Sequence, residues 1–102
     1  MKPNRQDSDT QQARAEEALF RAIVSLENSG VCGNFIRELW TPAELPALLD
    51  RWQVVEILQQ GLAYLRIHDM TGVIVNTIGG VARFLSDCFG GYLAALDRTG
   101  AG

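Results

Sequence analysis

Few side chains in this sequence of 102 residues could do catalytic chemistry. The only histidine is His68, and the two cysteines, Cys32 and Cys88, do not have the spacing of metal ligands. No paired carboxylates stand beside a glycine-rich turn, and no nucleophile has a candidate base. We therefore expect no catalysis, no metal and no cofactor, and we expect both thiols to be reduced in a cytoplasmic protein.

Recognition chemistry has more candidates, all in the second half of the sequence. Asn76 can bond an adenine edge with both atoms of its amide, and Ile74 or Thr77 can contact a thymine methyl group. Arg83 can reach a phosphate, but it can equally pair with Asp87 one helical turn later. Asn76 and Thr77 have plain alternatives too, as a solvated residue near a helix start and as a residue packed against a turn.

The composition favours one small helical domain. Apolar residues make up 47% of the sequence, which is too many for a disordered chain. No alternating run of Val, Ile and Thr indicates a strand, and no apolar run has the length of a membrane span. The net charge of -3 weighs against nucleic acid as a partner, since domains that bind it usually carry a basic face. Because small helical chains often complete their core by pairing, we expect a homodimer.

Apolar residues at three- and four-residue spacing predict the helices. We expect residues 1–10 to be flexible, residues 11–98 to form one helical domain and residues 99–102 to form a tail. Asn28, Ser29 and Gly30 are expected to end the first helix in a glycine stop. The expected helices, with no strand among them, span residues 11–28, 31–39, 42–61, 63–70, 74–86 and 91–98.

Thr41-Pro42-Ala43-Glu44 is the clearest local signal in the sequence. A threonine N-cap, a proline at the first helical position and a glutamate at the third form a capping box, which predicts a helix start at residue 42. Pro46 then lies within the helix, where its missing N–H should loosen the first turn. The apolar side of this helix is expected to consist of Leu45, Leu48, Leu49, Trp52, Val55 and Leu58.

Residues 63–83 have the pattern of a helix-turn-helix, a short helix followed by the turn Thr71-Gly72-Val73 and a second helix. We expect His68 to lie at the edge of the helix crossing, partly solvated. Gly79 and Gly80 interrupt the second helix, and each costs roughly 1 kcal/mol relative to alanine. The apolar residues expected to lock the second helix against the first are Ile67, Val73, Ile78 and Val81.

Together these segments resemble the Trp repressor family, in particular its TrpR-like relatives of the YerC/YecD type. The resemblance extends from about residue 18 to residue 98. It implies a cytoplasmic transcriptional regulator, an intertwined homodimer whose two helix-turn-helix units read a palindromic operator in double-stranded DNA. The segments that carry it are Thr41-Pro42-Ala43-Glu44-Leu45, Asp50-Arg51-Trp52, Thr71-Gly72-Val73, Thr77-Ile78 and Gly90-Gly91-Tyr92.

The resemblance also implies positions for ligand and DNA contacts. In the Trp repressor two arginines flank the bound tryptophan, and the first falls on Arg51 while the second falls on Gly80; Thr41 is a third ligand position. Because Gly80 has no side chain, we expect no tight binding of tryptophan as a co-repressor. The residues expected to contact DNA are Tyr64, Arg66, Ile74, Val75, Asn76, Thr77, Gly79, Gly80 and Arg83.

The expected DNA surface is poor in basic residues. Relatives tend to be basic where Leu65 and Gly80 stand, and each missing phosphate contact removes one counterion-release contribution to affinity. We therefore expect DNA binding to be weak or strongly salt-sensitive. Ile74, Val75 and the adjacent glycines would also suit contact with another protein. The alternative function is therefore a DNA-silent dimeric scaffold or protein-interaction module, natural or engineered, on the same fold.

Overall fold

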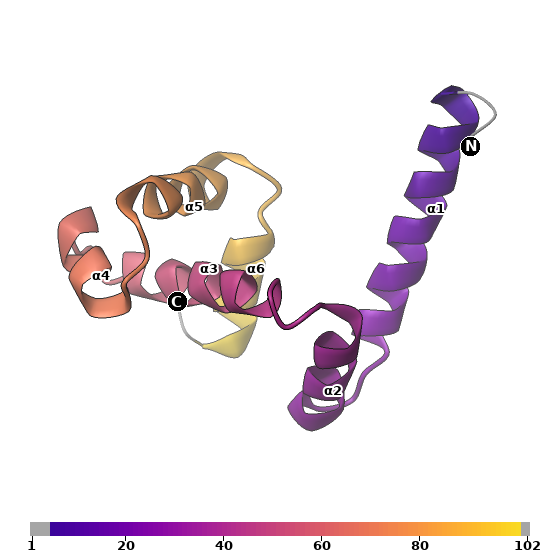
Figure 1. Cartoon of the computed structure of the whole chain (residues 1–102), viewed down its shortest axis with the longest axis horizontal. Helices are drawn as coiled ribbons and strands as arrows, with labels where there is room; N and C mark the ends of the chain where they lie inside the picture. Colours follow the sequence, from indigo (N-terminus) through magenta and orange to yellow (C-terminus); the bar gives the residue numbers. More distant parts are fainter. Residues whose placement is uncertain (1–4, 101–102) are drawn as a thin grey trace. The chain divides into compact units, whose positions relative to one another are not determined.

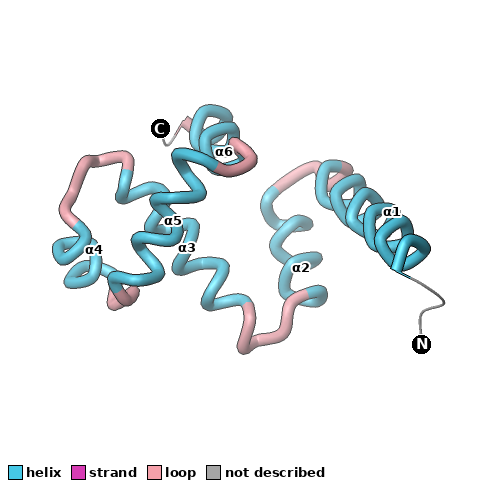
Figure 2. Tube along the Cα trace, turned by 90° about the horizontal axis from the view of Figure 1, so that it is seen from above, coloured by secondary structure: helices cyan, strands magenta, loops and turns pink. Residues whose placement is uncertain are grey.

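The computed structural model describes residues 5–100, which form helices joined by short loops and contain no strand (Figures 1 and 2). The chain divides into two compact units, residues 1–41 and residues 42–102. The predicted all-helical class and the order of the helices are confirmed within the described range. The helices there are α1 (Arg5–Val24), α2 (Ser29–Leu39), α3 (Leu45–Leu58), α4 (Tyr64–Thr71), α5 (Val75–Asp87) and α6 (Gly91–Thr99).

The first unit contains α1 and α2, and α1 is displaced toward the N-terminus relative to the prediction. It begins at Arg5 instead of residue 11 and ends at Val24 instead of residue 28. The described part of the segment expected to be flexible is therefore helical. Residues 1–4, and residues 101–102 of the predicted tail, lie outside the described residues.

Asn28 begins α2, and the glycine stop predicted at residues 28–30 is wrong. Asn28 has extended backbone angles, and its side-chain oxygen accepts the Val31 N–H at 2.9 Å, as an N-cap residue does. Gly30 lies in the first turn of α2. The same residue type can end one helix or cap the next, and here the cap hydrogen bond decides.

The start of α3 also differs from the prediction. The helix begins at Leu45, and residues 42–44 form a turn ahead of it, so the start at residue 42 that the capping box predicted is wrong. With this start, Pro46 lies in the first helical turn, where a backbone N–H has no partner within the helix. Pro46 therefore removes no helical hydrogen bond, and the loosening expected of it has no cause.

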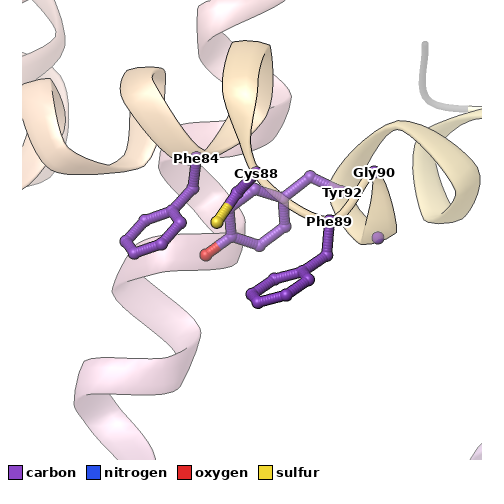
Figure 3. Close-up of a pocket in the computed structure, with 6 residues that line it drawn as sticks. Phe84, Cys88, Phe89, Gly90 and Tyr92 are labelled. Carbon is purple, nitrogen blue, oxygen red and sulfur yellow. The ribbon is translucent and has the colours of Figure 1, made fainter.

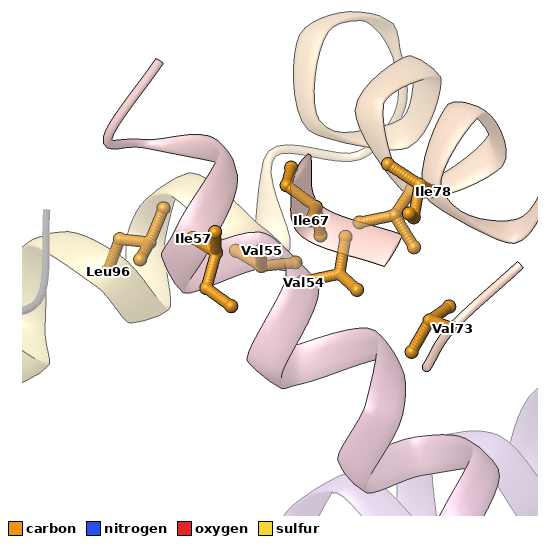
Figure 4. Close-up of a cluster of buried hydrophobic side chains, with 8 residues drawn as sticks. Val54, Val55, Ile57, Ile67, Val73, Ile78 and Leu96 are labelled. Atoms are coloured by element: carbon orange, nitrogen blue, oxygen red, sulfur yellow. The ribbon is translucent and has the colours of Figure 1, made fainter. Parts of the chain in front are cut away.

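One buried hydrophobic cluster organises the second unit (Figure 4). Within it α3 packs against α4 and α5, and α6 packs against α5. Four of the buried residues are those predicted to lock the helix-turn-helix, which confirms that prediction. The buried side chains are Val54, Val55 and Ile57 of α3, Ile67 of α4, Val73 of the following loop, Ile78 and Val81 of α5, and Leu96 of α6.

Candidate nucleic-acid interface

Hydrogen bonds hold the turn between α4 and α5 in one shape. Gly72 has a left-handed conformation (φ 77°), which favours glycine, and its N–H donates to the His68 carbonyl at 2.8 Å. The Thr71 hydroxyl donates to the Ile67 carbonyl at 2.8 Å and accepts the Val73 N–H at 3.0 Å. His68 Nδ1 donates to the Val73 carbonyl at 2.8 Å. His68 is half-buried, as predicted, and its hydrogen bond holds the turn that sets the orientation of α5 relative to α4.

The outward face of α5 has a side chain at each end and none between. Successive helical residues are about 100° apart, which places Asn76 and Arg83 opposite the buried Ile78. Both outward side chains are exposed. Gly79 and Gly80 lie between them, and the helix continues through both glycines from Val75 to Asp87.

The two adjacent glycines have different surroundings. A Cβ placed on Gly79 would lie 3.8 Å from Cε2 of Tyr64, so the tyrosine ring lies against α5 at this point. A Cβ placed on Gly80 would meet no heavy atom within 4 Å. The backbone of Gly80 therefore borders open space that a longer side chain could enter.

Two of the predicted ligand positions lie at one cavity beside α5. This cavity, of about 370 Å³, has both Arg51 and Gly80 in its lining. Its lining residues include one with a guanidinium group, two with a hydroxyl group and two that are apolar. Thr41 is the last residue of the first unit, and its part in a ligand site stays a prediction. The remaining lining residues are Thr77, Val81, Phe84 and Tyr92.

Thr77 lies on the cavity side of α5. It is half-buried and lines a second, smaller cavity of about 260 Å³, together with Arg51, Asp50 and the turn residue Gly72. Thr77, one of the residues predicted to contact DNA, thus lines the same cavity as Arg51 of α3. Its role at a DNA surface stays a prediction.

Exposed apolar side chains outnumber basic ones at the helix-turn-helix. Leu65 is 70% exposed, Ile74 59% and Val75 37%. Arg66 and Arg83 are exposed as well, and no ion pair involving either arginine is present among the described residues. The alternative in which Arg83 pairs with Asp87 is therefore not what the structure contains, and Arg83 is available to an anionic partner.

A second apolar surface lies where α5 leads into α6. A cavity of about 390 Å³ opens there, and the side chains of Phe84, Phe89 and Tyr92 reach to the same side of the chain (Figure 3). Phe89 is 97% exposed. Cys88 also lines this cavity, and neither Cys88 nor Cys32 forms a disulfide.

Among the described residues, no helix is long and apolar enough to cross a membrane. In the same part of the chain, no group of three or more His, Cys, Asp or Glu side chains is placed to hold a metal ion.

Comparisons with known proteins identify relatives of this arrangement. The model of the family described as Trp repressor protein matches residues 15–100. The chain is 35% identical over 83 residues to the uncharacterized protein YerC of Bacillus subtilis strain 168. The aligned residues make up 81% of this chain and 80% of YerC. It is thus similar to a protein whose own activity is not described.

Solved structures show the same fold. One is the crystal structure of a protein from Staphylococcus aureus that is provisionally named a Trp repressor; it has a TM-score of 0.80 and 35% identity, over 87% of this chain and 89% of that one. Another is a TrpR-like protein from Eubacterium eligens, with a TM-score of 0.79 and 33% identity, over 85% of this chain and 90% of that one. Since the family model matches most of the chain, including both helices of the helix-turn-helix, this protein belongs to the Trp repressor protein family.

Proposed function

We propose that this protein is a cytoplasmic, DNA-binding regulator of transcription, and not an enzyme, and that it binds a palindromic operator as a homodimer. The exposed first turn of α5 carries this proposal. In helix-turn-helix proteins the N-terminal residues of the second helix contact base edges in the major groove. Here those residues are Ile74, Val75 and Asn76, and all of them are exposed beside a turn fixed by hydrogen bonds.

We further propose that the affinity for DNA is low and that its salt dependence is set by a small number of phosphate contacts. Arg66 and Arg83 are the arginines of α4 and α5, so a dimer would offer four phosphate contacts. Four such contacts give a slope of about -3.6 in log affinity against log salt, which is roughly a 150-fold loss between about 50 and 200 mM.

A salt titration with pooled random duplex DNA tests this proposal. Fluorescence anisotropy should give the slope above, and Arg83→Gln should make the slope shallower by about two, since each subunit loses one contact worth about 0.9. Arg98→Gln, an exposed arginine of α6 outside the helix-turn-helix, is the matched control and should leave the slope unchanged. An absence of binding at about 50 mM salt would overturn the proposal.

The homodimer is supported by apolar surface that the single chain leaves uncovered. Phe89 of the second unit and Val24 of the first are 97% and 83% exposed, and exposed apolar side chains of this size often mark surfaces that bind another protein. Sedimentation equilibrium should give twice the monomer mass at micromolar concentration. A folded monomer under those conditions would contradict a dimer in which the two chains share a core.

We also propose that tryptophan does not bind tightly. The cavity beside α5 has Arg51 in its lining, but Gly80 occupies the position of the second arginine of the family and offers only backbone. Isothermal titration with L-tryptophan should show no saturable heat at micromolar concentration. Gly80→Arg should be accommodated, because no heavy atom lies within 4 Å of a Cβ at Gly80, and it should raise DNA affinity by adding a cation to each subunit.

A DNA-silent dimeric scaffold is the second candidate function. The exposure of Leu65 and Ile74, at 70% and 59%, favours it, because such side chains suit a protein partner better than phosphates. The same titration separates the two candidates: a scaffold shows no DNA binding at low salt, and Gly80→Arg leaves it DNA-silent.

A further inference from the structure

The first turn of α5 brings one amide and two aliphatic side chains to the exposed end of the helix-turn-helix. Ile74 precedes the first helical residue as its N-cap and is 59% exposed; Val75 is 37% exposed, and Asn76 is exposed as well. Ile78, one turn later, is fully buried against the core. No lysine or arginine lies within this turn.

Beyond its first turn, α5 has no side chain of its own on this face for two turns; the Tyr64 ring lies against Gly79, and Gly80 borders the cavity that Arg51 lines. Gly79 and Gly80 lie on this stretch, and Arg83 stands seven residues after Asn76, which is about 10 Å along the helix axis. Bare backbone permits close approach to a groove, but it offers a base edge neither a side-chain amide nor a methyl group. Direct contact with bases is therefore concentrated in the first turn.

We propose that this first turn recognises an A·T base pair and uses the thymine methyl group as its apolar contact. The inference rests on the proposed function, since it assigns the DNA sequence that the same surface prefers. The Asn76 amide can accept from adenine N6 and donate to adenine N7 at once. Ile74 and Val75 then pack on the C5-methyl of thymine, an apolar group that the other bases do not present in the major groove.

The first turn of α5 does not fit a G·C pair equally well. Guanine presents two acceptors, O6 and N7, so a two-point contact requires two donors from one side chain, as arginine or lysine supplies. The amide of Asn76 has one accepting and one donating end, which matches adenine. Ile74 and Val75 would lie against a G·C pair without a methyl group to contact.

The experiment removes the methyl group from the DNA and its contact from the protein separately. Selection from a random duplex pool should yield half-sites that share an A·T pair at a fixed position. Replacing that thymidine by deoxyuridine in both half-sites should lower affinity about 15-fold, at roughly fourfold for each buried methyl group. Asn76→Ala should lower affinity by about 5- to 150-fold for each half-site and relax the preference for adenine.

A coupled variant tests whether these side chains make the contact. The double variant Ile74→Ser, Val75→Ser should bind thymidine and deoxyuridine duplexes equally, because polar side chains replace both apolar ones. Arg83→Gln is the control: it should weaken both duplexes by the same factor and leave the thymidine preference intact. Circular dichroism should confirm that each variant keeps the helical content of the wild type.

Three outcomes would overturn the inference while leaving DNA binding established. They are selected sites with a G·C pair or no preferred pair, equal binding of thymidine and deoxyuridine duplexes by the wild type, and a thymidine preference that persists in the double variant. If the wild type bound no duplex at low salt, the proposed function would fail first and the inference with it.

Discussion

The two units of this chain use their apolar residues in different ways. In the second unit eight side chains are buried in one cluster. In the first unit no side chain is buried from residue 8 to residue 41, although Phe20, Val24, Val31 and Leu39 are all apolar and exposed. The difference lies in geometry, because two helices cannot surround a core, whereas α3 to α6 enclose one.

This comparison separates what the single chain completes from what it leaves open. The second unit buries the residues that fix the helix-turn-helix, so the candidate DNA surface rests on a core of its own. The first unit exposes the apolar side of its helices and, in the proposed homodimer, a second copy supplies the cover. α3 shows both behaviours: Val54 and Val55 are fully buried, whereas Leu49 is 59% exposed.

The largest effect should follow from a cavity in the core of the second unit. Ile78 is fully buried and was predicted to lock α5 onto α4, so Ile78→Ala should cost about 2–5 kcal/mol of unfolding free energy in urea titration. Ile74→Ala on the same helix end is the matched control, and its cost should stay within about 0.5 kcal/mol because Ile74 is largely exposed. Equal losses of unfolding free energy in the two variants would contradict the burial of Ile78 and the exposure of Ile74.

A substitution in the first unit should have a smaller effect, and it should change the dimer dissociation constant instead of the stability of the core. Phe20 is 53% exposed in the single chain. If a second copy covers it, Phe20→Ala should raise the dimer dissociation constant at least tenfold, since burying a phenylalanine is worth about 1.5–3 kcal/mol. Arg14→Ala, an exposed residue of the same helix, should leave it unchanged. An unaltered dissociation constant for Phe20→Ala would show that the partner does not cover α1.

The sequence alone could predict the core of the helix-turn-helix because its signals are local. A glycine in the turn and apolar residues one helical turn apart were enough to place Ile67, Val73 and Ile78 in the interior. α3 was harder because it is apolar on two sides. The spacing selected Val55, which the structure buries, together with Leu49, which is exposed, and it missed the buried Val54 and Ile57.

The candidate site shows the same division between local and tertiary signals. Helical periodicity places Asn76 and Arg83 on one face without any structure. The hydrogen bond from His68 to Val73 and the packing of Tyr64 against Gly79 depend on how α4 meets α5, so no sequence pattern could indicate them. The predicted helix start at residue 42 and the predicted glycine stop were wrong for a related reason, since several neighbouring residues could each begin or end a helix.

The hydrogen bond from His68 should have a moderate effect on the second unit. His68→Ala removes the donor to the Val73 carbonyl and should cost about 1 kcal/mol of unfolding free energy, the usual net value of one hydrogen bond. His68→Ala should also lower DNA affinity, because the turn between α4 and α5 becomes more flexible and no longer holds α5 in one orientation. His68→Asn, which keeps a donor at a similar reach, should recover part of both losses. Unchanged stability in His68→Ala would show that the turn does not depend on this bond.

The smallest effect should come from the two glycines of α5, where an uncharged Cβ tests whether stability and DNA binding change in opposite directions. Gly80→Ala adds a Cβ that meets no heavy atom within 4 Å, so it should stabilise the helix by up to about 1 kcal/mol through propensity alone. Gly79→Ala, whose Cβ would reach Tyr64 at 3.8 Å, should gain a similar amount. If the glycines serve close approach to DNA, both variants should melt at higher temperature and bind duplexes severalfold more weakly. If Gly80→Ala raises stability and binding together, the bare face is not part of the contact, and the recognition turn alone meets the groove.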